Sequence, residues 1–487
     1  MRLPLLFLTL FLASLTLVAM AIRPRPANDG RTRLLWASSA NPYRAAQVVH
    51  FNELHPRLLL RQDSSNNRFE KNIVQLSSGV GPDLYDAISG TSLQAYVETG
   101  VALDITPVAA ENGLAAGADT WSAVVNEITL NGRQYGYPAN VSAQICLFNK
   151  NLFDRYGVPY PPQHPTWDEF FTLFQRFQSP PPGGGPRIDA FSAMDYSGRA
   201  PSVIVWKLGF QSRRGEFFSP DGTQLTIDSE DLRVAFELHR DALFRYRVHP
   251  PAAAMGAMTG AGAWGGGAIA QFAEGRFAAL VTGKFALASL REFVAHQKKQ
   301  QDRWQADPVR QRTEAKPEVL RLGAFLLPRF PDRRPGVVAT AQTVVINPTS
   351  PHREEAMTFL RFLATDAYAR MVMPYGLPGN PRRVTYDFPV THPELAEHEV
   401  TRCVVAALDY GYQLRKSPFL LDVDIDRALE HQIARLESNP DTDIRTLLAE
   451  TQRELEAMLQ ANLRRDSRLA ALYRERIAAR TAPPSAP

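Results

Sequence analysis

The chain has 487 residues, of which 45% are hydrophobic and 21% are charged, a composition that excludes disordered chains and membrane channels. Its 54 basic and 50 acidic residues leave a net charge of +4, and the arginines are scattered among acidic residues. Nucleic-acid-binding proteins gather basic residues in runs or on one face, so this distribution argues against that class. Because the chain is too long for one ordinary core, we expect two globular lobes.

The N-terminus carries an export signal. An apolar run from Leu3 to Ile22 follows Arg2, and Ala19-Met20-Ala21 has the small-x-small pattern of a cleavage site. A run of about 20 residues could also span a bilayer, so an uncleaved signal-anchor is the alternative. Residues 1–25 are therefore a predicted signal peptide or signal-anchor, and the rest of the chain is expected outside the cytoplasm. No cysteine lies near the run, so we predict that the protein is not a lipoprotein.

Short strands and helices alternate in the first 100 residues. The predicted strands are 33–37, 58–60 and 83–88, and the predicted helices are 45–54, 69–76 and 93–99. This alternation is typical of a mainly parallel sheet covered on both faces.

The sequence pattern changes after Pro138. A strand is predicted at 144–148, and Thr166 with Glu169 forms a capping box that begins a helix. Residues 180–186 form a Pro/Gly-rich loop, and helices are predicted to about residue 300. Heptad-like apolar spacing from about 426 to 478 predicts two or three surface helices. Residues 481–487 are predicted to form a disordered tail.

The two cysteines, Cys146 and Cys403, both lie in apolar sequence. An oxidising compartment would permit a bridge between them, but buried free thiols are favoured because cysteine is among the most buried residue types.

Several short motifs occur in a characteristic order. They are Gly81-Pro82-Asp83, Thr99-Gly100-Val101-Ala102-Leu103-Asp104, Tyr135-Gly136-Tyr137-Pro138, Leu147-Phe148-Asn149-Lys150-Asn151-Leu152-Phe153, Trp167-Asp168-Glu169-Phe170, Phe272-Ala273-Glu274-Gly275, and Tyr375-Gly376-Leu377-Pro378. Over about residues 32 to 460 this order resembles the family-1 extracellular solute-binding proteins of ABC importers, the maltose-binding-protein-like sugar binders. An extra segment around 290–320 departs from the family pattern.

The resemblance implies an α/β periplasmic-binding-protein-like fold of two lobes joined by a three-segment hinge. Lobe one is expected at 32–142 plus 338–412, and lobe two at 143–337 plus 413–480. The resemblance also implies a monomer that binds a small polar ligand, most readily a carbohydrate. Its expected partner is a permease of the inner membrane. No cofactor, metal or catalytic activity is expected.

Candidate ligand residues lie in loops at the carboxyl ends of strands and at the crossovers, where ligands of open α/β sheets bind. They are Ser39, Asn41, Ser89, Thr91, Asn140, Ser142, Gln144, Trp264, Phe285, Leu377, Tyr410 and Tyr412. Turn or cap roles are the alternative for the small polar residues, and core packing is the alternative for the aromatic ones. Lys284 is expected to be solvated. The loops lack a cluster of carboxylates or arginines, which favours a neutral polar ligand.

Two other functions stay open. A ligand sensor for a membrane receptor is one, and a retained signal-anchor would favour it. An exported glycan hydrolase is the other, but no pair of carboxylates is placed in the loops, as glycosidases need. Asp422, Asp424 and Asp426 alternate as in a calcium loop but lack its glycine and distal glutamate, so we expect a helix N-terminus there.

Overall fold

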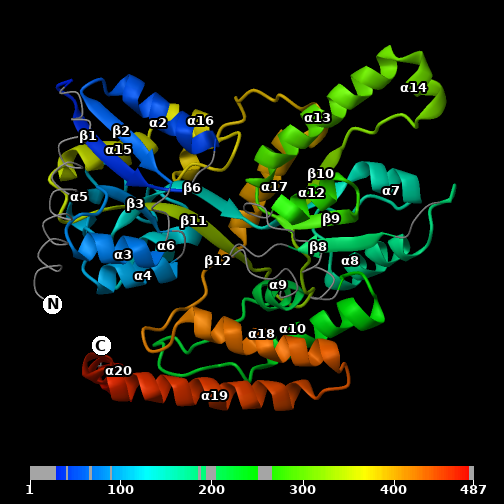
Figure 1. Ribbon diagram of the computed structural model, residues 1–487. Coiled ribbons are helices and arrows are strands. Elements are labelled where there is room, and N and C mark those ends of the chain that lie inside the picture. Colours follow the sequence, from blue (N-terminus) through cyan, green and yellow to red (C-terminus); the bar gives the residue numbers. More distant parts are fainter. Residues whose placement is uncertain are drawn as a thin grey trace, which may run out of the picture.

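The computed structural model describes residues 29–39, 42–64, 69–87, 90–184, 188–193, 204–250 and 266–481. The predicted signal segment lies outside these residues, as does the predicted tail from residue 482 onward. Two larger β-sheets with their helices stand side by side, and three C-terminal helices lie along their lower edge (Figure 1). The predicted α/β architecture of two lobes is therefore confirmed.

The first sheet is built on three parallel strands, with the order β12-β11-β3-β1-β2 and β6 paired to β11. Strand β11 runs antiparallel to both β3 and β6. Its strands are β1 (Thr32–Ala37), β2 (Leu58–Asp63), β3 (Leu84–Ala87), β6 (Gly136–Ala143), β11 (Val337–Ile346) and β12 (Gly411–Tyr412). The parallel part confirms the predicted alternation of strands and helices.

Five helices and one 3-10 turn surround this sheet before β6, and three further helical segments follow β11. The first group is α2 (Pro42–Leu54), α3 (Phe69–Ser77), α4 (Gly90–Glu98), α5 (Thr106–Ala109), η1 (Ser122–Val124) and α6 (Val125–Ile128). The second is α15 (Arg353–Leu363), α16 (Asp366–Val372) and η5 (Pro381–Arg383). A small hairpin of β4 (Thr129–Leu130) and β5 (Arg133–Gln134) leads into β6.

The second sheet has the order β10-β7-β9-β8. Its strands are β7 (Ile145–Asn149), β8 (Asp189–Ala193), β9 (Phe277–Thr282) and β10 (Leu322–Phe325). Because β7 follows β6 after one residue, and β11 follows β10, the chain passes between the sheets at both places.

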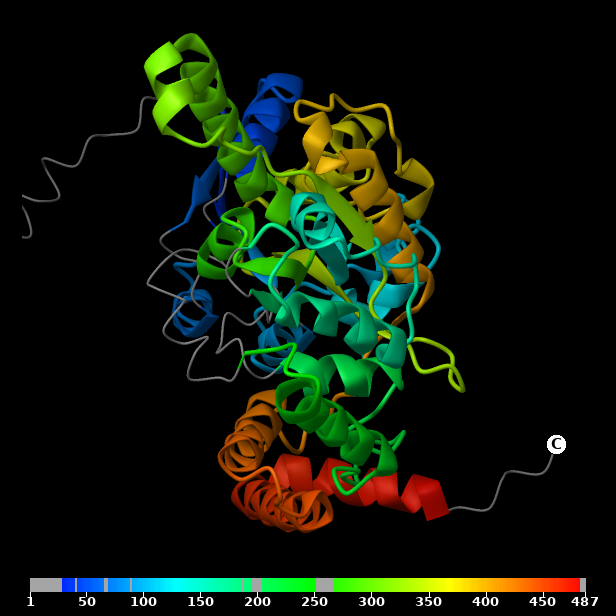
Figure 2. The same cartoon turned by 90° about the vertical axis from the view of Figure 1, so that its right-hand side faces the viewer.

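The helices of this region include a long projecting one. They are α7 (Lys150–Tyr156), α8 (Trp167–Phe174), η2 (Gln175–Gln178), α9 (Ile204–Ser212), α10 (Glu230–Arg240), the π-helical turn η4 (Asp241–Arg245), α12 (Gly266–Ala273), α13 (Ala286–Ala306), α14 (Pro308–Thr313), η6 (Pro393–Leu395) and α17 (Glu397–Asp409). The capping box of Thr166 and Glu169 at the start of α8 is confirmed. The extra segment noted in the sequence is α13 and α14, which project away from the body (Figure 2).

The heptad-like C-terminal region forms three helices, as predicted. They are α18 (Asp422–Ser438), α19 (Ile444–Arg465) and α20 (Ser467–Thr481). Helix α18 begins at Asp422, so the aspartates mark a helix N-terminus as expected. Apolar residues of α18 and α19 share a separate core with Trp206 and Phe236 of α9 and α10.

The largest core lies around the second sheet and includes the hinge-facing ends of β6 and β11. Both Cys146 and Cys403 belong to it, and both are buried free thiols. Burial raises the pKa of the Cys146 thiol well above its usual value. No helix among the described residues is long and apolar enough to cross a membrane.

The prediction that Lys284 is solvated is wrong. Lys284 lies in the turn between β9 and α13 with no exposed surface, and its Nζ donates to the backbone oxygens of Met373 and Gly376. The Phe388 ring centroid lies 5.0 Å from the ammonium nitrogen. Burial, with Arg291 nearby, lowers the pKa of Lys284 to about 7. From the sequence alone, a lysine in a Gly-containing turn is predicted to be exposed. The carbonyl groups that accept from Lys284 belong to a segment about 90 residues later, so its neighbours along the chain do not reveal them.

Leu447 tests the separate C-terminal core. Its side chain has no exposed surface, so Leu447→Ala leaves a cavity and should lower the free energy of unfolding by about 2–5 kcal/mol. Denaturant unfolding followed by circular dichroism measures this change. The matched control is Leu421→Ala, whose side chain is 46% exposed, and a comparable loss in that control would contradict the assignment of the core.

Lys284 should make stability depend on pH. Its pKa is about 7 in the folded chain and about 10.4 when unfolded, so the unfolded state binds more protons between these values. This group's contribution therefore rises with pH, by at most about 1.4 kcal/mol per unit from pH 7 to pH 10, and is constant below pH 7. Lys284→Met should remove that slope in urea unfolding across this range, whereas exposed Lys299→Met should keep it. Equal slopes in all three proteins would refute the assignment.

Candidate functional site

A buried carboxylate lies where the parallel strands of the first sheet end. Asp86, near the carboxyl end of β3, accepts hydrogen bonds from Trp36 Nε1 at 2.9 Å and from Ser38 Oγ at 2.6 Å, both at the end of β1. Gln342 of β11 donates to the same carboxylate at 2.6 Å through Nε2. Neighbouring parallel strands thus bring together groups far apart in sequence, at the edge where α/β proteins bind ligands.

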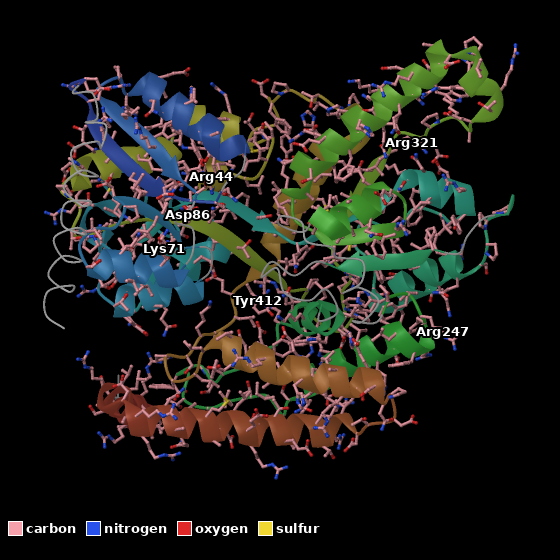
Figure 3. The ribbon with its side chains drawn as sticks, viewed as in Figure 1. Arg44, Lys71, Asp86, Arg247, Arg321 and Tyr412 are labelled. Atoms are coloured by element: carbon pink, nitrogen blue, oxygen red, sulfur yellow. The ribbon has the colours of Figure 1, made fainter. Side chains whose placement is uncertain are left out.

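An arginine from helix α2 completes this cluster. Arg44 is fully buried, and it donates to Gln47 Oε1 at 2.7 Å and to Asn140 Oδ1 of β6 at 2.9 Å. Its guanidinium carbon lies 4.9 Å from the Trp36 ring centroid. Arg44 and Asp86 lie on the side of the first sheet that faces the second one (Figure 3).

The charges of this polar cluster balance. Burial raises the pKa of the Asp86 carboxyl, while Arg44 and the three donors oppose that shift. The arrangement offers a carboxylate, a guanidinium, amide groups and an indole face, a set that suits hydroxyl groups on a ring. The sequence predicted no group of several carboxylates or arginines in these loops, and the polar cluster holds one of each, Asp86 on β3 and Arg44 on α2. The two neutralise each other, so a neutral ligand stays favoured.

Two predicted residues join the cluster directly. Gln342 Nε2 donates to Ser39 Oγ at 3.3 Å, and Asn140 lies opposite Gln342 in the β6–β11 ladder. Ser142 follows Asn140 on the same face of β6, because side chains two apart on a strand point the same way. Among the described residues, Ser142 Oγ is buried without a hydrogen-bond partner. Gln144, also buried, occupies the step between β6 and β7. The predicted polar row at the first crossover thus runs from the cluster toward the second sheet.

Several other predicted residues cannot be placed. Asn41, Ser89 and Trp264 lie outside the described residues, and Thr91 belongs to α4 without a described side chain. Their contacts with a ligand remain predictions.

The remaining predicted residues are not among the hydrogen-bonded side chains of the cluster. Leu377 is fully buried and bridges Val141 of β6, and Phe285 is half-buried against the largest core at the start of α13. Tyr410 faces the His164 ring, with centroids 5.1 Å apart. Tyr412 is buried, and the Arg214 guanidinium lies over its ring at 4.8 Å. Burial raises the pKa of Tyr412 far above its usual value.

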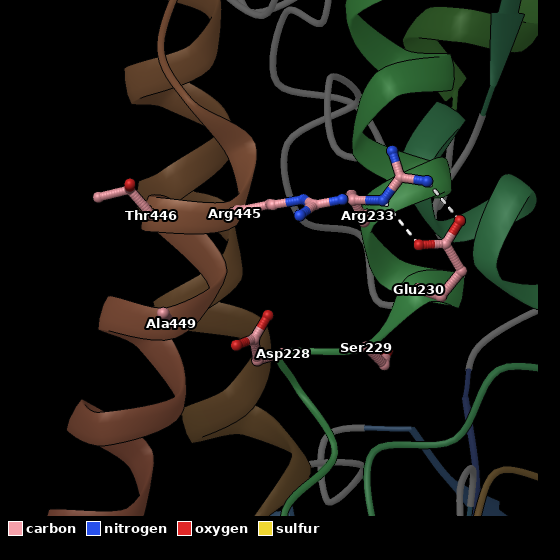
Figure 4. A pocket seen from close by; sticks show the side chains of 7 residues that line it. All are labelled: Asp228, Ser229, Glu230, Arg233, Arg445, Thr446 and Ala449. Atoms are coloured by element: carbon pink, nitrogen blue, oxygen red, sulfur yellow. Dashed lines mark hydrogen bonds and ion pairs between the residues drawn. The ribbon is translucent and has the colours of Figure 1, made fainter.

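Tyr412 of β12 does line a cavity of about 480 Å³, together with Arg214, Glu216 and Gln413. Another hollow, of about 450 Å³, lies between α10 and α19 (Figure 4). There Arg233 donates to Glu230 at 2.7 Å, so these two charges of its lining are paired with each other. Among the described residues, no group of three or more potential ligands could hold a metal ion.

Sequence reasoning missed five members of the cluster: Trp36, Ser38, Arg44, Asp86 and Gln342. A signal existed for Trp36 and Arg44, because an aromatic residue lies one position before the end of the first strand and an arginine lies in the first turn of the helix that follows it. The sequence holds no such signal for Gln342, because its role depends on the antiparallel placement of β11 beside β3.

Comparisons with known proteins agree with this geometry. A family model described as bacterial extracellular solute-binding protein matches residues 36–370. An ABC substrate-binding protein of Listeria monocytogenes, solved with cycloalternan, has a TM-score of 0.64 and 17% identity over 88% of this chain and 99% of that one. The sugar-binding protein MalE of Xanthomonas citri has a TM-score of 0.64 and 16% identity over 88% and 98%.

A third neighbour has a different ligand. UgpB of Mycobacterium tuberculosis, solved with glycerophosphocholine, has a TM-score of 0.63 and 15% identity over 89% of this chain and 100% of that one. At these identities the solved structures establish the shared fold, and the family match establishes membership. The chain belongs to the bacterial extracellular solute-binding proteins.

Proposed function

We propose that this protein captures a small polar solute, most readily a sugar or oligosaccharide, between two lobes and delivers it to the permease of an ABC importer. The observation that carries the proposal is the polar cluster of Asp86, Arg44, Asn140, Gln342 and Trp36. A sugar hydroxyl can donate to a carboxylate and accept from a guanidinium or amide, and a sugar ring has an apolar face for an indole.

The solved neighbours support a carbohydrate more than a charged ligand. Two are described by their binding of sugars or of cycloalternan, whereas one holds glycerophosphocholine. In this chain the single guanidinium of the cluster faces the carboxylate Asp86, so it would not by itself attract a phosphodiester.

Two crossovers support the boundaries at 142/143 and 337/338 in the division into lobe one, 32–142 plus 338–412, and lobe two, 143–337 plus 413–480. Helix α17, which lies within 338–412, contacts β7 and β10 of the second sheet as well as β6 and β11 of the first. The boundary at 142/143 falls where β6 leads into β7, and that at 337/338 where β11 begins. Two lobes joined by such crossovers can close around a ligand. With an exported N-terminus, the protein would act outside the cytoplasm as a monomer.

Two alternatives can be separated from this proposal. A glycan hydrolase would need two carboxylates roughly 5–9.5 Å apart across the bond, whereas the cluster contains Asp86 alone among the described carboxylates. A receptor-coupled sensor would bind the same ligand without supporting its uptake, so uptake assays in cells lacking the protein separate sensor from importer.

The first test is a thermal-shift screen of the purified protein against monosaccharides, oligosaccharides, polyols and glycerophosphodiesters. A ligand at 100 times its dissociation constant should stabilise the folded chain by about 2.7 kcal/mol and raise the melting temperature. Gln342→Leu removes a donor to Asp86 and should weaken binding at least tenfold. The matched control Lys71→Ala, at an exposed position on α3 of the same lobe, should bind as the wild type does.

Turnover of a glycan that is lost in Asp86→Asn would overturn the binding-protein proposal. Ligand binding unchanged by Gln342→Leu would move the site away from the cluster.

A further inference from the structure

The segment Met373–Gly376 connects the two sheets through its backbone. On one side it leads into Leu377, which exchanges two backbone hydrogen bonds with Val141 of β6, at 2.9 and 3.1 Å. Gly376 packs so closely on β6 that an added Cβ would lie 3.2 Å from the Asn140 Cβ. The segment therefore lies directly behind the residue that holds Arg44 in the polar cluster.

On its other side the segment receives two cations from the second sheet and its helix. Lys284 Nζ donates to the carbonyl oxygens of Met373 and Gly376. Arg291 Nη2 of α13 donates to Pro374 O at 2.6 Å, and its guanidinium carbon lies 5.3 Å from the Tyr375 ring centroid. Three of the four carbonyl groups in the segment thus accept hydrogen bonds from these two side chains.

A buried ion pair stiffens this arrangement. Arg291 makes two hydrogen bonds to Glu397 at the start of α17, at 3.1 and 2.6 Å, and the Glu397 side chain is fully buried. Bidentate arginine–carboxylate pairs hold both partners in one geometry. Lys284, by contrast, has no carboxylate hydrogen-bonded to it in the described residues, although Glu397 is near enough to favour its charge.

We propose that Lys284 and Arg291 clamp the backbone of residues 373–376 between the two lobes, and that release of the Lys284 contact lets the lobes pivot and frees Asn140 from its position. Lys284 and Arg291 are positioning residues in this account, because they act on the cluster through Gly376 and Asn140. The link to ligand binding rests on the proposed function, whereas the clamp itself does not.

The clamp should respond to pH. The charged groups that face Lys284 are Arg291 of α13 and Glu397 of α17. Among the described residues, the only aromatic ring over Lys284 is that of Phe388, whereas the Tyr375 ring lies over Arg291. An ammonium buried in the clamp is costly, whereas in the released form water solvates it. Protonation therefore favours release, and the ratio of clamped to released protein should rise up to about tenfold per pH unit above pH 7.

The test measures the distance between the lobes without any ligand. Spin labels are attached in the full-length protein at Val74→Cys of α3 and Val309→Cys of α14, which are 69% and 67% exposed. The native cysteines are buried, so the labels should react at the introduced sites alone. Double electron–electron resonance then gives the distance distribution at pH 6, 7, 8 and 9.

We expect two distance populations, with the clamped one growing by at least tenfold relative to the released one between pH 7 and pH 9. Lys284→Met should give the same distribution at every pH, while exposed Lys299→Met on α13 should behave as the wild type. A wild-type distribution that does not change from pH 6 to pH 9 overturns the clamp even if Lys284→Met fails to fold.

Ligand binding separates the clamp from the proposed function. If the distances shift with pH and no solute binds, the clamp stands and the proposed function fails. If a solute binds while the distances stay constant, the proposed function stands and the clamp is refuted.

Discussion

The pairing of β6 with β11 is the constraint on which the rest of the structure depends. The two strands pair in antiparallel register from Ala143 opposite Ala339 to Gly136 opposite Val345. One strand leads out of the first sheet and the other leads back into it, so this ladder joins the sheets. It also puts Asn140 opposite Gln342, and thereby delivers two amides to the edge where β1 and β3 end.

The arrangement of the polar cluster follows from the free-energy cost of burying a charged group. An ionised carboxylate without partners is strongly unfavourable in a protein interior, so Asp86 fixes the positions of Trp36, Ser38 and Gln342 around it. Arg44 in turn ties α2 to β6 through Asn140. Apart from Ser38, these side chains are held by four strands and a helix rather than by loops, and a site built in this way is preorganised for a ligand. The buried cations at residues 373–376 apply the same principle to backbone carbonyl groups.

Local features could be predicted from the sequence, and long-range pairings could not. Strands β1, β2 and β3, the capping box at Thr166 and the three C-terminal helices followed from periodicity and end signals. Ser39 was found because polar residues after an apolar strand point to a ligand edge, and Asn140 because the family resemblance implied a crossover at that place. Gln342 and the burial of Lys284 could not be predicted, since each depends on a backbone segment distant in sequence. The type of a side chain and its neighbours along the chain can be taken from a sequence, whereas the partner that a crossover brings to it cannot.

The central claim is that solute binds at the carboxyl ends of β1 and β3. Hydrogen exchange measured by mass spectrometry, with and without a ligand identified by screening, tests it most directly because it needs no mutation. The account predicts that protection gathers in peptides containing Ser38, Asp86 and Asn140, with little change in α19 and α20. Protection confined to the cavity beside Tyr412, or to the hollow between α10 and α19, would contradict it.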